Sequence, residues 1–208
     1  MAEKKCRGRA GTLVIMMKAP RIGAVKRRLA RQIGAVAAWR VYRAMAADLC
    51  RRLGADRRWT TIVSLTPDRA SGLPQACRAL PAVPQGRGDL GARMQRILDC
   101  APPGPVLVIG SDIPAITPAH IARAFRALKR ADVVFGPAAD GGYWLVGARR
   151  VPRKPRLFEG VRWSHRQTLA DTLKNARGLK VGLVDTLRDV DDLDVLRAWT
   201  RSSRTTGA

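Results

Sequence analysis

A short apolar run constrains the fold of this chain more than any other feature of the sequence. It begins at Val106 and reads VLVIGSDIP, so a glycine, an acid and a proline end it. An apolar run of this length, stopped by turn residues, predicts a strand buried on both faces, as in a parallel sheet. Asp112 then follows the carboxyl end of a central strand, where open α/β sheets bind ligands. The next helix has its own start signals in Thr117 and Pro118, so Asp112 is not needed as its cap.

Strand and helix patterns alternate along the rest of the chain. Further strands are predicted at 13–17, 60–65, 132–135, 144–147 and 181–184. Helices are predicted at 25–54, 73–80, 90–98, 118–130, 166–177 and 191–200. This alternation predicts a single-domain, three-layer α/β/α fold with a mostly parallel sheet. The domain is expected to span residues 12–200, between a basic N-terminal segment, 1–11, and a flexible polar tail, 201–208.

The chain has 39 lysines and arginines against 16 acids, which gives a formal net charge of +23. Such a charge attracts phosphate polymers. The cations are spread along the whole chain and aromatic residues are few, so a solvated arginine-rich surface is favoured over a nucleic-acid partner. The cysteines at positions 6, 50, 77 and 100 lack zinc-ligand spacing and indicate reduced thiols. No apolar run approaches the length of a membrane span, and none reads as a signal peptide, which predicts a cytoplasmic protein.

Two glycine-containing loops have the composition of phosphate sites. The first follows strand 13–17 and enters a helix, where backbone amides and cations favour bound phosphate, although a solvated basic helix end would look the same. Its candidate nucleotide ligands are Lys18, Pro20, Gly23, Lys26 and Arg28. The second loop leads into helix 90–98, and its candidates are Gly88, Asp89 and Arg93. Asp89 has two interpretations, since it can bind a base or ribose or simply cap that helix.

Acids near the strand ends predict a metal site and an acceptor site. Asp112 would hold Mg²⁺ or Mn²⁺ against the donor phosphates, and Asp191 or Asp189 would supply a second carboxylate. The turn at 136–143 also follows a strand and has two glycines after an acid. It is either a structural turn or part of a surface that faces a small-molecule acceptor. The candidate acceptor contacts are Asp140, Gly141, Gly142, Tyr143, Trp163 and His165.

Taken in this order, the motifs resemble a bacterial family of GT-A-like transferases of unknown function. The family patterns are K-A-P-x-x-G-x-V-K-T-R-L, G-D-L-G-x-R, G-[TS]-D-x-P, G-P-x-x-D-G-G-Y, W-S and D-x-D-T. Here they fall at residues 18–29, 88–93, 110–114, 136–143, 163–164 and 189–192, so the resemblance covers nearly the whole chain. The sequence departs from it at Arg27 and Asp192, where the family has threonine.

The resemblance implies a nucleotide-diphospho-sugar transferase (GT-A) fold and a distant kinship with enzymes that guanylylate phospholactate or molybdopterin. It implies a metal-dependent transferase with a nucleotide-activated donor, and glycosyl transfer from a nucleotide-diphospho-sugar is favoured. One alternative is a nucleotidyltransferase, similar to the guanylyltransferases, that acts on a small phosphorylated acceptor. The other is a non-catalytic basic module that binds nucleic acid. The expected catalytic residues are Asp112, Asp140 and Lys26, and the oligomeric state is not indicated.

Overall fold

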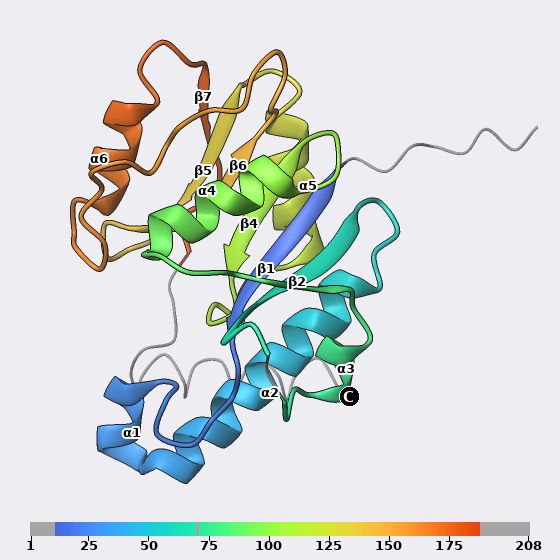
Figure 1. The fold of residues 1–208 in the computed structure, drawn as a ribbon, viewed down its shortest axis with the longest axis vertical. Coiled ribbons are helices and arrows are strands. Elements are labelled where there is room, and N and C mark those ends of the chain that lie inside the picture. The colour runs from blue at the N-terminus through green and yellow to red at the C-terminus, as the bar shows by residue number, and fades with distance from the viewer. Residues whose placement is uncertain (1–10, 70, 188–208) are drawn as a thin grey trace, which may run out of the picture.

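One seven-stranded sheet organises the computed structural model, which describes residues 11–69 and 71–187 (Figure 1). The strand order is β3-β2-β1-β4-β6-β5-β7. The strands are β1 (Thr12–Lys18), β2 (Thr60–Thr66), β3 (Ala82–Pro84), β4 (Val106–Gly110), β5 (Val133–Pro137), β6 (Tyr143–Ala148) and β7 (Val181–Leu183). Only β6 runs antiparallel to its neighbours, β4 and β5, and every other pairing is parallel. The sheet is therefore mostly parallel, as the sequence predicts.

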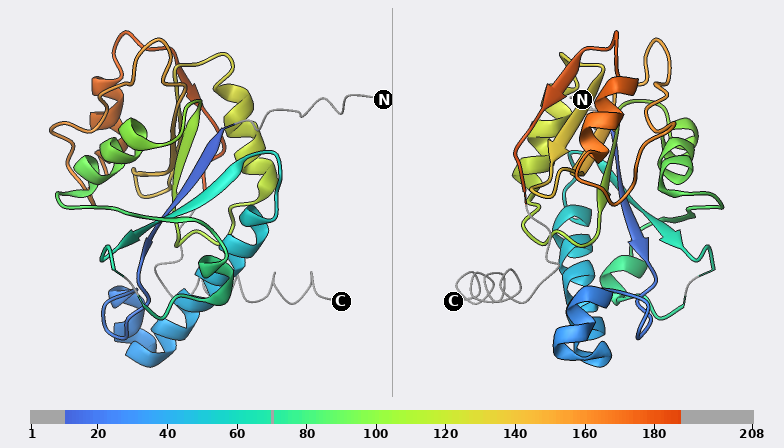
Figure 2. Two further views of the ribbon diagram at one scale, coloured as in Figure 1. Left: turned by 45° about the vertical axis from the view of Figure 1, so that its right-hand side comes forward. Right: turned by 90° about the vertical axis from the view of Figure 1, so that its left-hand side faces the viewer.

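Helices cover both faces of this sheet. They are α1 (Arg27–Ile33), α2 (Ala35–Gly54), α3 (Gln75–Arg78), α4 (Leu90–Cys100), α5 (Pro118–Ala127) and α6 (Thr168–Asn175). Helices α4 and α6 lie on one face, and α2, α3 and α5 lie on the other (Figure 2). This arrangement confirms the predicted three-layer α/β/α fold. None of the helices in the described part of the chain is long and apolar enough to cross a membrane.

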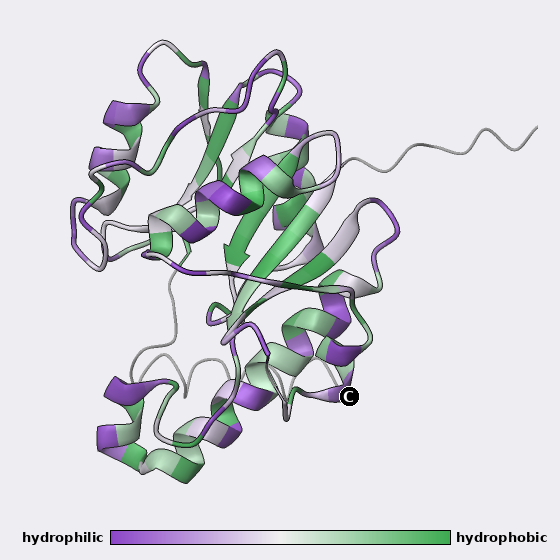
Figure 3. Cartoon of the chain, in the orientation of Figure 1, coloured by the Kyte–Doolittle hydropathy of each residue, from purple (hydrophilic) through white to green (hydrophobic). Residues whose placement is uncertain are grey.

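The central strands are apolar on both sides because a helical layer covers each side. In β4, Leu107 and Ile109 enter the core beneath α2 and α5, whereas Val106 and Val108 enter the core beneath α4. Successive side chains of a strand point to opposite faces, so a strand inside a three-layer fold needs apolar residues throughout. The helices show the complementary pattern, with apolar residues toward the sheet and polar residues outward (Figure 3).

Three elements differ between the prediction and the structure. The helix expected at 25–54 is two helices, because Gly34 adopts a positive φ of 84° that an α-helix does not allow. The helix expected at 73–80 shortens to the four residues of α3. Strand β3 was not predicted, since its three residues are too few for an alternation pattern and it forms by pairing with β2. The predicted helix 191–200, the tail 201–208 and all but the last residue of the basic segment 1–11 lie outside the described residues.

Candidate nucleotide and metal site

Six of the seven strands point to the same edge of the sheet, here called the carboxyl edge. Strands β1 to β4 are mutually parallel, and β5 and β7 share their direction because β6 is antiparallel to both β4 and β5. The loops that follow β1, β3, β4 and β5 therefore lie at one edge, although they are far apart in the sequence (Figure 1). The candidate residues from Lys18 to Tyr143 all lie in one of these loops or at the adjoining end of a helix or strand.

Asp112 and Lys26 meet at this edge as an ion pair. Lys26 Nζ lies 3.4 Å from Asp112 Oδ2, and the two side chains are 5% and 44% exposed. Lys26 is the N-cap of α1 and has a positive φ of 47°. This left-handed conformation is unfavourable for a lysine, so the surrounding structure must hold it in place. A Cβ on Gly110 would lie 2.9 Å from Asp112 Oδ1, so the glycine leaves space for the carboxylate. The site therefore combines a buried ammonium with a carboxylate that solvent can reach.

Tyr42 fixes the geometry around this pair, although no local pattern in the sequence indicates it as a site residue. Its hydroxyl accepts a hydrogen bond from Lys18 N at 3.2 Å and donates one to Lys18 O at 2.9 Å. It also lies 3.0 Å from Ser111 Oγ, next to Asp112. Burial raises the pKa of Tyr42 to about 12, so the phenol is neutral at ordinary pH. Tyr42 thus joins the carboxyl ends of β1 and β4.

Trp39, one turn before Tyr42 on α2, secures the same loop. Its Nε1 donates a hydrogen bond to Pro20 O at 2.8 Å. The helical spacing of Trp39 and Tyr42 is typical of core residues, and both do pack in the core layer of α2. The overlooked signal was their polar N–H and O–H groups, which need partners when they are buried.

The loop between β3 and α4 is held by the N-cap of α4 and by side chains of that helix. Asp89 is the N-cap of α4, and its Oδ1 accepts a hydrogen bond from Ala92 N at 2.8 Å, which confirms the capping interpretation. Arg93 Nε donates to Gly88 O at 2.9 Å, and Arg93 Nη1 lies 3.3 Å from Thr66 Oγ1. These groups shape the loop beside the ends of β2 and β3. Any nucleotide contact of Asp89 would use its other carboxylate oxygen.

The turn between β5 and β6 has the strict backbone demands that its glycines indicate. Asp140 Oδ1 accepts a hydrogen bond from Gly142 N at 2.9 Å, while the side chain itself stays exposed. Gly141 has a positive φ of 88°, and a Cβ there would lie 2.0 Å from Arg166 O. The turn is therefore packed against the segment that leads into α6. That segment also carries His165, which is exposed and whose Nδ1 accepts from Gln167 N at 3.2 Å.

Two of the candidate acceptor residues are turned toward the protein. The Tyr143 ring packs edge-on against Phe135 with 5.5 Å between centroids, and its hydroxyl is buried without a hydrogen bond in the described part of the chain. Burial raises its pKa as well. The partly buried Trp163 packs over Gly91 of α4, where a Cβ would lie 2.8 Å from the indole ring. The structure thus places Asp140 and His165, but not the Tyr143 hydroxyl, on the accessible surface.

The candidate metal ligands are only partly within the described structure. Asp112 is described, whereas Asp189 and Asp191 lie outside the described residues. Across residues 11–69 and 71–187, no cluster of three or more histidine, cysteine or acidic side chains could hold a metal ion. Mg²⁺ is commonly bound by one or two carboxylates together with substrate phosphates and water. The exposed carboxylate of Asp112 fits that mode and does not form a closed protein cage.

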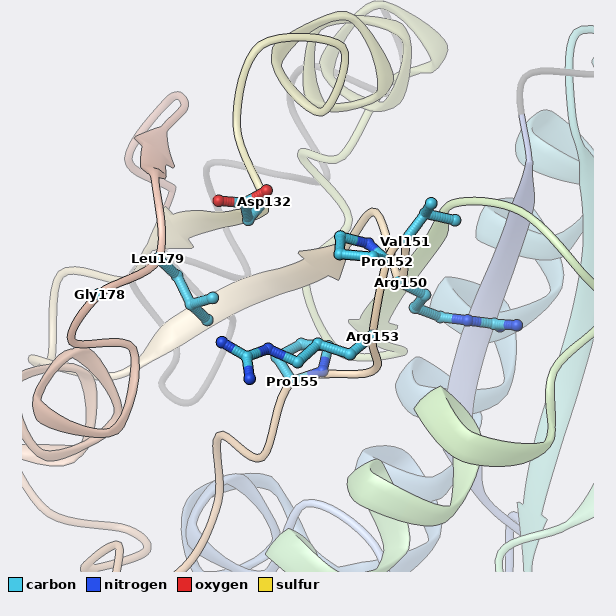
Figure 4. Close-up of a pocket in the computed structure, with 8 residues that line it drawn as sticks. All are labelled: Asp132, Arg150, Val151, Pro152, Arg153, Pro155, Gly178 and Leu179. Atoms are coloured by element: carbon cyan, nitrogen blue, oxygen red, sulfur yellow. The ribbon is translucent and has the colours of Figure 1, made fainter.

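A pocket of about 160 Å³ lies at the opposite end of the sheet (Figure 4). Its walls come from residues before β5, after β6 and before β7: Asp132, Arg150, Val151, Pro152, Arg153, Pro155, Gly178 and Leu179. None of the candidate site residues contributes to it. The described candidate residues therefore lie away from this pocket.

Several solved structures have a fold similar to that of this chain. A provisionally named nucleotide-diphospho-sugar transferase from Desulfovibrio desulfuricans G20 is 27% identical, and the match has a TM-score of 0.83 and covers 96% of this chain and 90% of that one. CMP:2-keto-3-deoxy-manno-octonic acid synthetase, complexed with CTP, is 13% identical with a TM-score of 0.57, covering 93% and 99%. Glucosyl-3-phosphoglycerate synthase from Mycobacterium tuberculosis, complexed with Mn²⁺, UDP and glucosyl-3-phosphoglycerate, is 13% identical with a TM-score of 0.53, covering 93% and 77%. At these last two identities the likeness concerns the fold alone.

These matches define the class of the protein: it has the nucleotide-diphospho-sugar transferase fold. The chain belongs to the family described as "Uncharacterized protein conserved in bacteria (DUF2064)", whose model matches residues 21–165. No curated protein matches the chain. The family match includes the loops of Lys26, Asp112 and Asp140.

Proposed function

We propose that this protein is a metal-dependent transferase that takes a group from a nucleotide-activated donor, with glycosyl transfer from a nucleotide-diphospho-sugar as the leading reaction. The observation that carries the proposal is the pairing of Asp112 with Lys26 at the carboxyl end of β4. A solvent-accessible carboxylate beside a buried ammonium can bind a divalent cation and an anionic phosphate in the same place.

The residues of the donor side have separate tasks in this proposal. Asp112 would bind Mg²⁺ or Mn²⁺, which when bound neutralises charge that develops on the leaving diphosphate. Lys26 would exchange its contact with Asp112 for a phosphate oxygen of the donor. Lys18 and Arg28 are exposed at the same edge and would add positive charge around the phosphates. Tyr42 would act as a positioning residue, because it holds the backbone of Lys18 and the hydroxyl of Ser111.

The acceptor side would lie at the turn between β5 and β6. Because β6 is hydrogen-bonded to β4, this turn is adjacent to the loop that carries Asp112. In glycosyl transfer the acceptor oxygen bonds to the sugar C1, the bond from C1 to the diphosphate oxygen breaks, and the acceptor proton passes to a base. Asp140 and His165 are the exposed candidates for that base.

Nucleotidyl transfer is the second candidate, and one observation favours it. Ser111 directly precedes Asp112 and is buried against Tyr42, so the β4 loop offers a single carboxylate and no neighbouring pair. In that reaction the acceptor would attack the α-phosphate of a nucleoside triphosphate and release pyrophosphate. The structural likeness to a CTP-bound synthetase is consistent with this alternative at the level of the fold. The leading reaction is supported by the higher likeness to a sugar transferase.

Ligand-induced thermal stabilisation would test the proposal and separate the two reactions. The full chain would be melted with nucleotide sugars and with nucleoside triphosphates, each with and without Mn²⁺. A Mn²⁺-dependent shift with one nucleotide sugar supports glycosyl transfer, whereas a shift with a triphosphate alone supports nucleotidyl transfer. No shift with any of these ligands would contradict both.

Two variants would locate the binding to the carboxyl edge. Asp112→Asn should abolish the Mn²⁺-dependent part of the shift, and Lys26→Met should weaken donor binding by about tenfold to a hundredfold, the usual effect of losing a charged hydrogen bond. Asp99→Asn is the matched control, since Asp99 lies near the far end of α4 and pairs with Arg156. If Asp112→Asn binds Mn²⁺ and nucleotide as the parent does, the assignment of Asp112 is wrong.

A further inference from the structure

The chain segment from residue 21 to residue 40, here called the basic lobe, projects beyond the carboxyl edge of the sheet. It contains the end of the loop after β1, α1 and the beginning of α2 (Figures 1 and 2). Helices α1 and α2 share a small buried cluster of their own, formed by Leu29, Ala38 and Met45. From Gly11 to Ala47 the sequence contains eight lysines and arginines and no aspartate or glutamate. The lobe is therefore a purely cationic projection.

The stability of the helices does not explain this charge pattern. Neither α1 nor α2 has an acid in its first turn, and Arg27 occupies the first turn of α1, where the helix dipole disfavours cations. Arg27 and Arg31 are both exposed and one turn apart, so they repel each other. These arginines lower the stability of the lobe by itself, and an external anionic surface would reverse that effect.

The lobe also exposes apolar side chains among its cations. Ile22 is 57% exposed and Val36 is 47% exposed. Cations combined with exposed aliphatic groups suit the interface of an anionic bilayer, where the charges meet headgroups and the aliphatic groups enter the acyl boundary. Single-stranded nucleic acid would instead require accessible aromatic rings. The aromatic ring of the lobe, Trp39, is partly buried, donates its N–H to Pro20 O and lies beneath the Arg43 guanidinium.

We propose that the basic lobe docks this protein on an anionic lipid surface through Arg21, Arg27, Arg31 and Arg40, with Ile22 and Val36 entering the headgroup layer. The inference rests on the exposed surface of the lobe and goes beyond the proposed function. Because Lys26 belongs both to the lobe and to the candidate site, the docked surface would lie beside the carboxyl edge.

Vesicle co-sedimentation of the full chain would test the docking. Vesicles of phosphatidylcholine with about one third phosphatidylglycerol should bind the protein, and vesicles of phosphatidylcholine alone should not. The double variant Arg27→Ser/Arg31→Ser should weaken binding about twenty-five-fold, at about a factor of five for each arginine near the surface. The double variant Ile22→Ser/Val36→Ser should weaken it about tenfold or more, and this loss should persist in about 0.5 M salt, where charge effects are screened.

A charge-matched control separates the lobe from the overall positive charge. Arg153 and Arg177 are exposed outside the lobe, near the pocket edge of the sheet, so Arg153→Ser/Arg177→Ser removes the same charge elsewhere. Equal losses from this control and from the lobe variant would overturn the proposal, since the attraction would then be diffuse. Tighter binding to polyuridylate or duplex DNA than to the anionic vesicles would also overturn it and identify a polynucleotide surface. Nucleotide binding is measured separately, so its failure would not affect this result.

Discussion

Removing the Tyr42 hydroxyl tests how the site is held together. The variant Tyr42→Phe leaves three groups without their partner: the N–H and C=O of Lys18 and the hydroxyl of Ser111. Tyr42 and Ser111 are only 5% and 6% exposed, so water replaces the lost hydrogen bonds poorly. At about 1 kcal/mol for each neutral buried hydrogen bond, the free energy of unfolding should fall by about 2–3 kcal/mol.

The pH dependence gives this prediction a second, independent signature. The pKa of Tyr42 is raised from 10.0 to about 12, chiefly by burial, so the folded protein retains the phenol proton more tightly than the unfolded chain. The resulting stability is fully present below pH 10 and is lost as the pH rises through 12. By pH 11 the parent should have lost about 1.4 kcal/mol through this linkage, which Tyr42→Phe cannot lose. The difference in the free energy of unfolding between the parent and Tyr42→Phe should therefore shrink by about that amount between pH 7 and pH 11.

Urea unfolding at the two pH values would measure both effects. The matched control is Tyr143→Phe, because the chain has two tyrosines and the Tyr143 hydroxyl is buried without a hydrogen bond in the described structure. Deleting an unpaired buried hydroxyl breaks no hydrogen bond and removes a desolvation cost, so Tyr143→Phe should not lower the free energy of unfolding at pH 7. The reasoning about the Tyr42 hydroxyl is wrong if Tyr42→Phe and Tyr143→Phe lower the free energy of unfolding equally at pH 7. It is also wrong if the stability difference between the parent and Tyr42→Phe does not change with pH.

Two further predictions concern the β5–β6 turn and the segment beside it. Gly141→Ala should destabilise the protein by about 2 kcal/mol or more, because the residue has a positive φ and its Cβ would meet Arg166 O. Gly142→Ala is the control, since Gly142 has no positive φ, and it should destabilise the protein much less in thermal unfolding. The Arg162 guanidinium holds the pKa of Asp171 well below its usual range. The contribution of this pair to the free energy of unfolding should be present above the ordinary carboxyl pKa and should be lost as the pH falls below it. In Asp171→Asn the free energy of unfolding should therefore fall less steeply as the pH is lowered through the acid range.

Local patterns in the sequence predicted most of the fold because each element is encoded by nearby residues. The run VLVIG became β4, with its side chains alternating between two cores, because only a strand covered on both faces is apolar throughout. Thr117 and Pro118 start α5 as predicted, since capping depends on a few adjacent residues. The break at Gly34 was overlooked because a glycine inside a helical pattern does not reveal its φ.

Pairings between distant residues could be expected only in outline. The sequence placed Asp112 and Lys26 at strand ends, but their 3.4 Å contact depends on β1 and β4 being neighbours in the sheet. The role of Tyr42 was hidden for the same reason, since its partners lie 24 and 69 residues away along the chain. The burial of the Tyr143 hydroxyl likewise depends on the helical layer that covers that face of the sheet.

The sequence by itself thus determined the kinds of elements, their order and the loops that carry charged side chains. These properties follow from periodicity, capping and turn chemistry over a few residues. Only the tertiary structure decided which charged groups meet, which polar groups are buried and which face solvent. Those outcomes depend on strand order and helix packing, which bring residues together across the sheet without leaving a local pattern in the sequence.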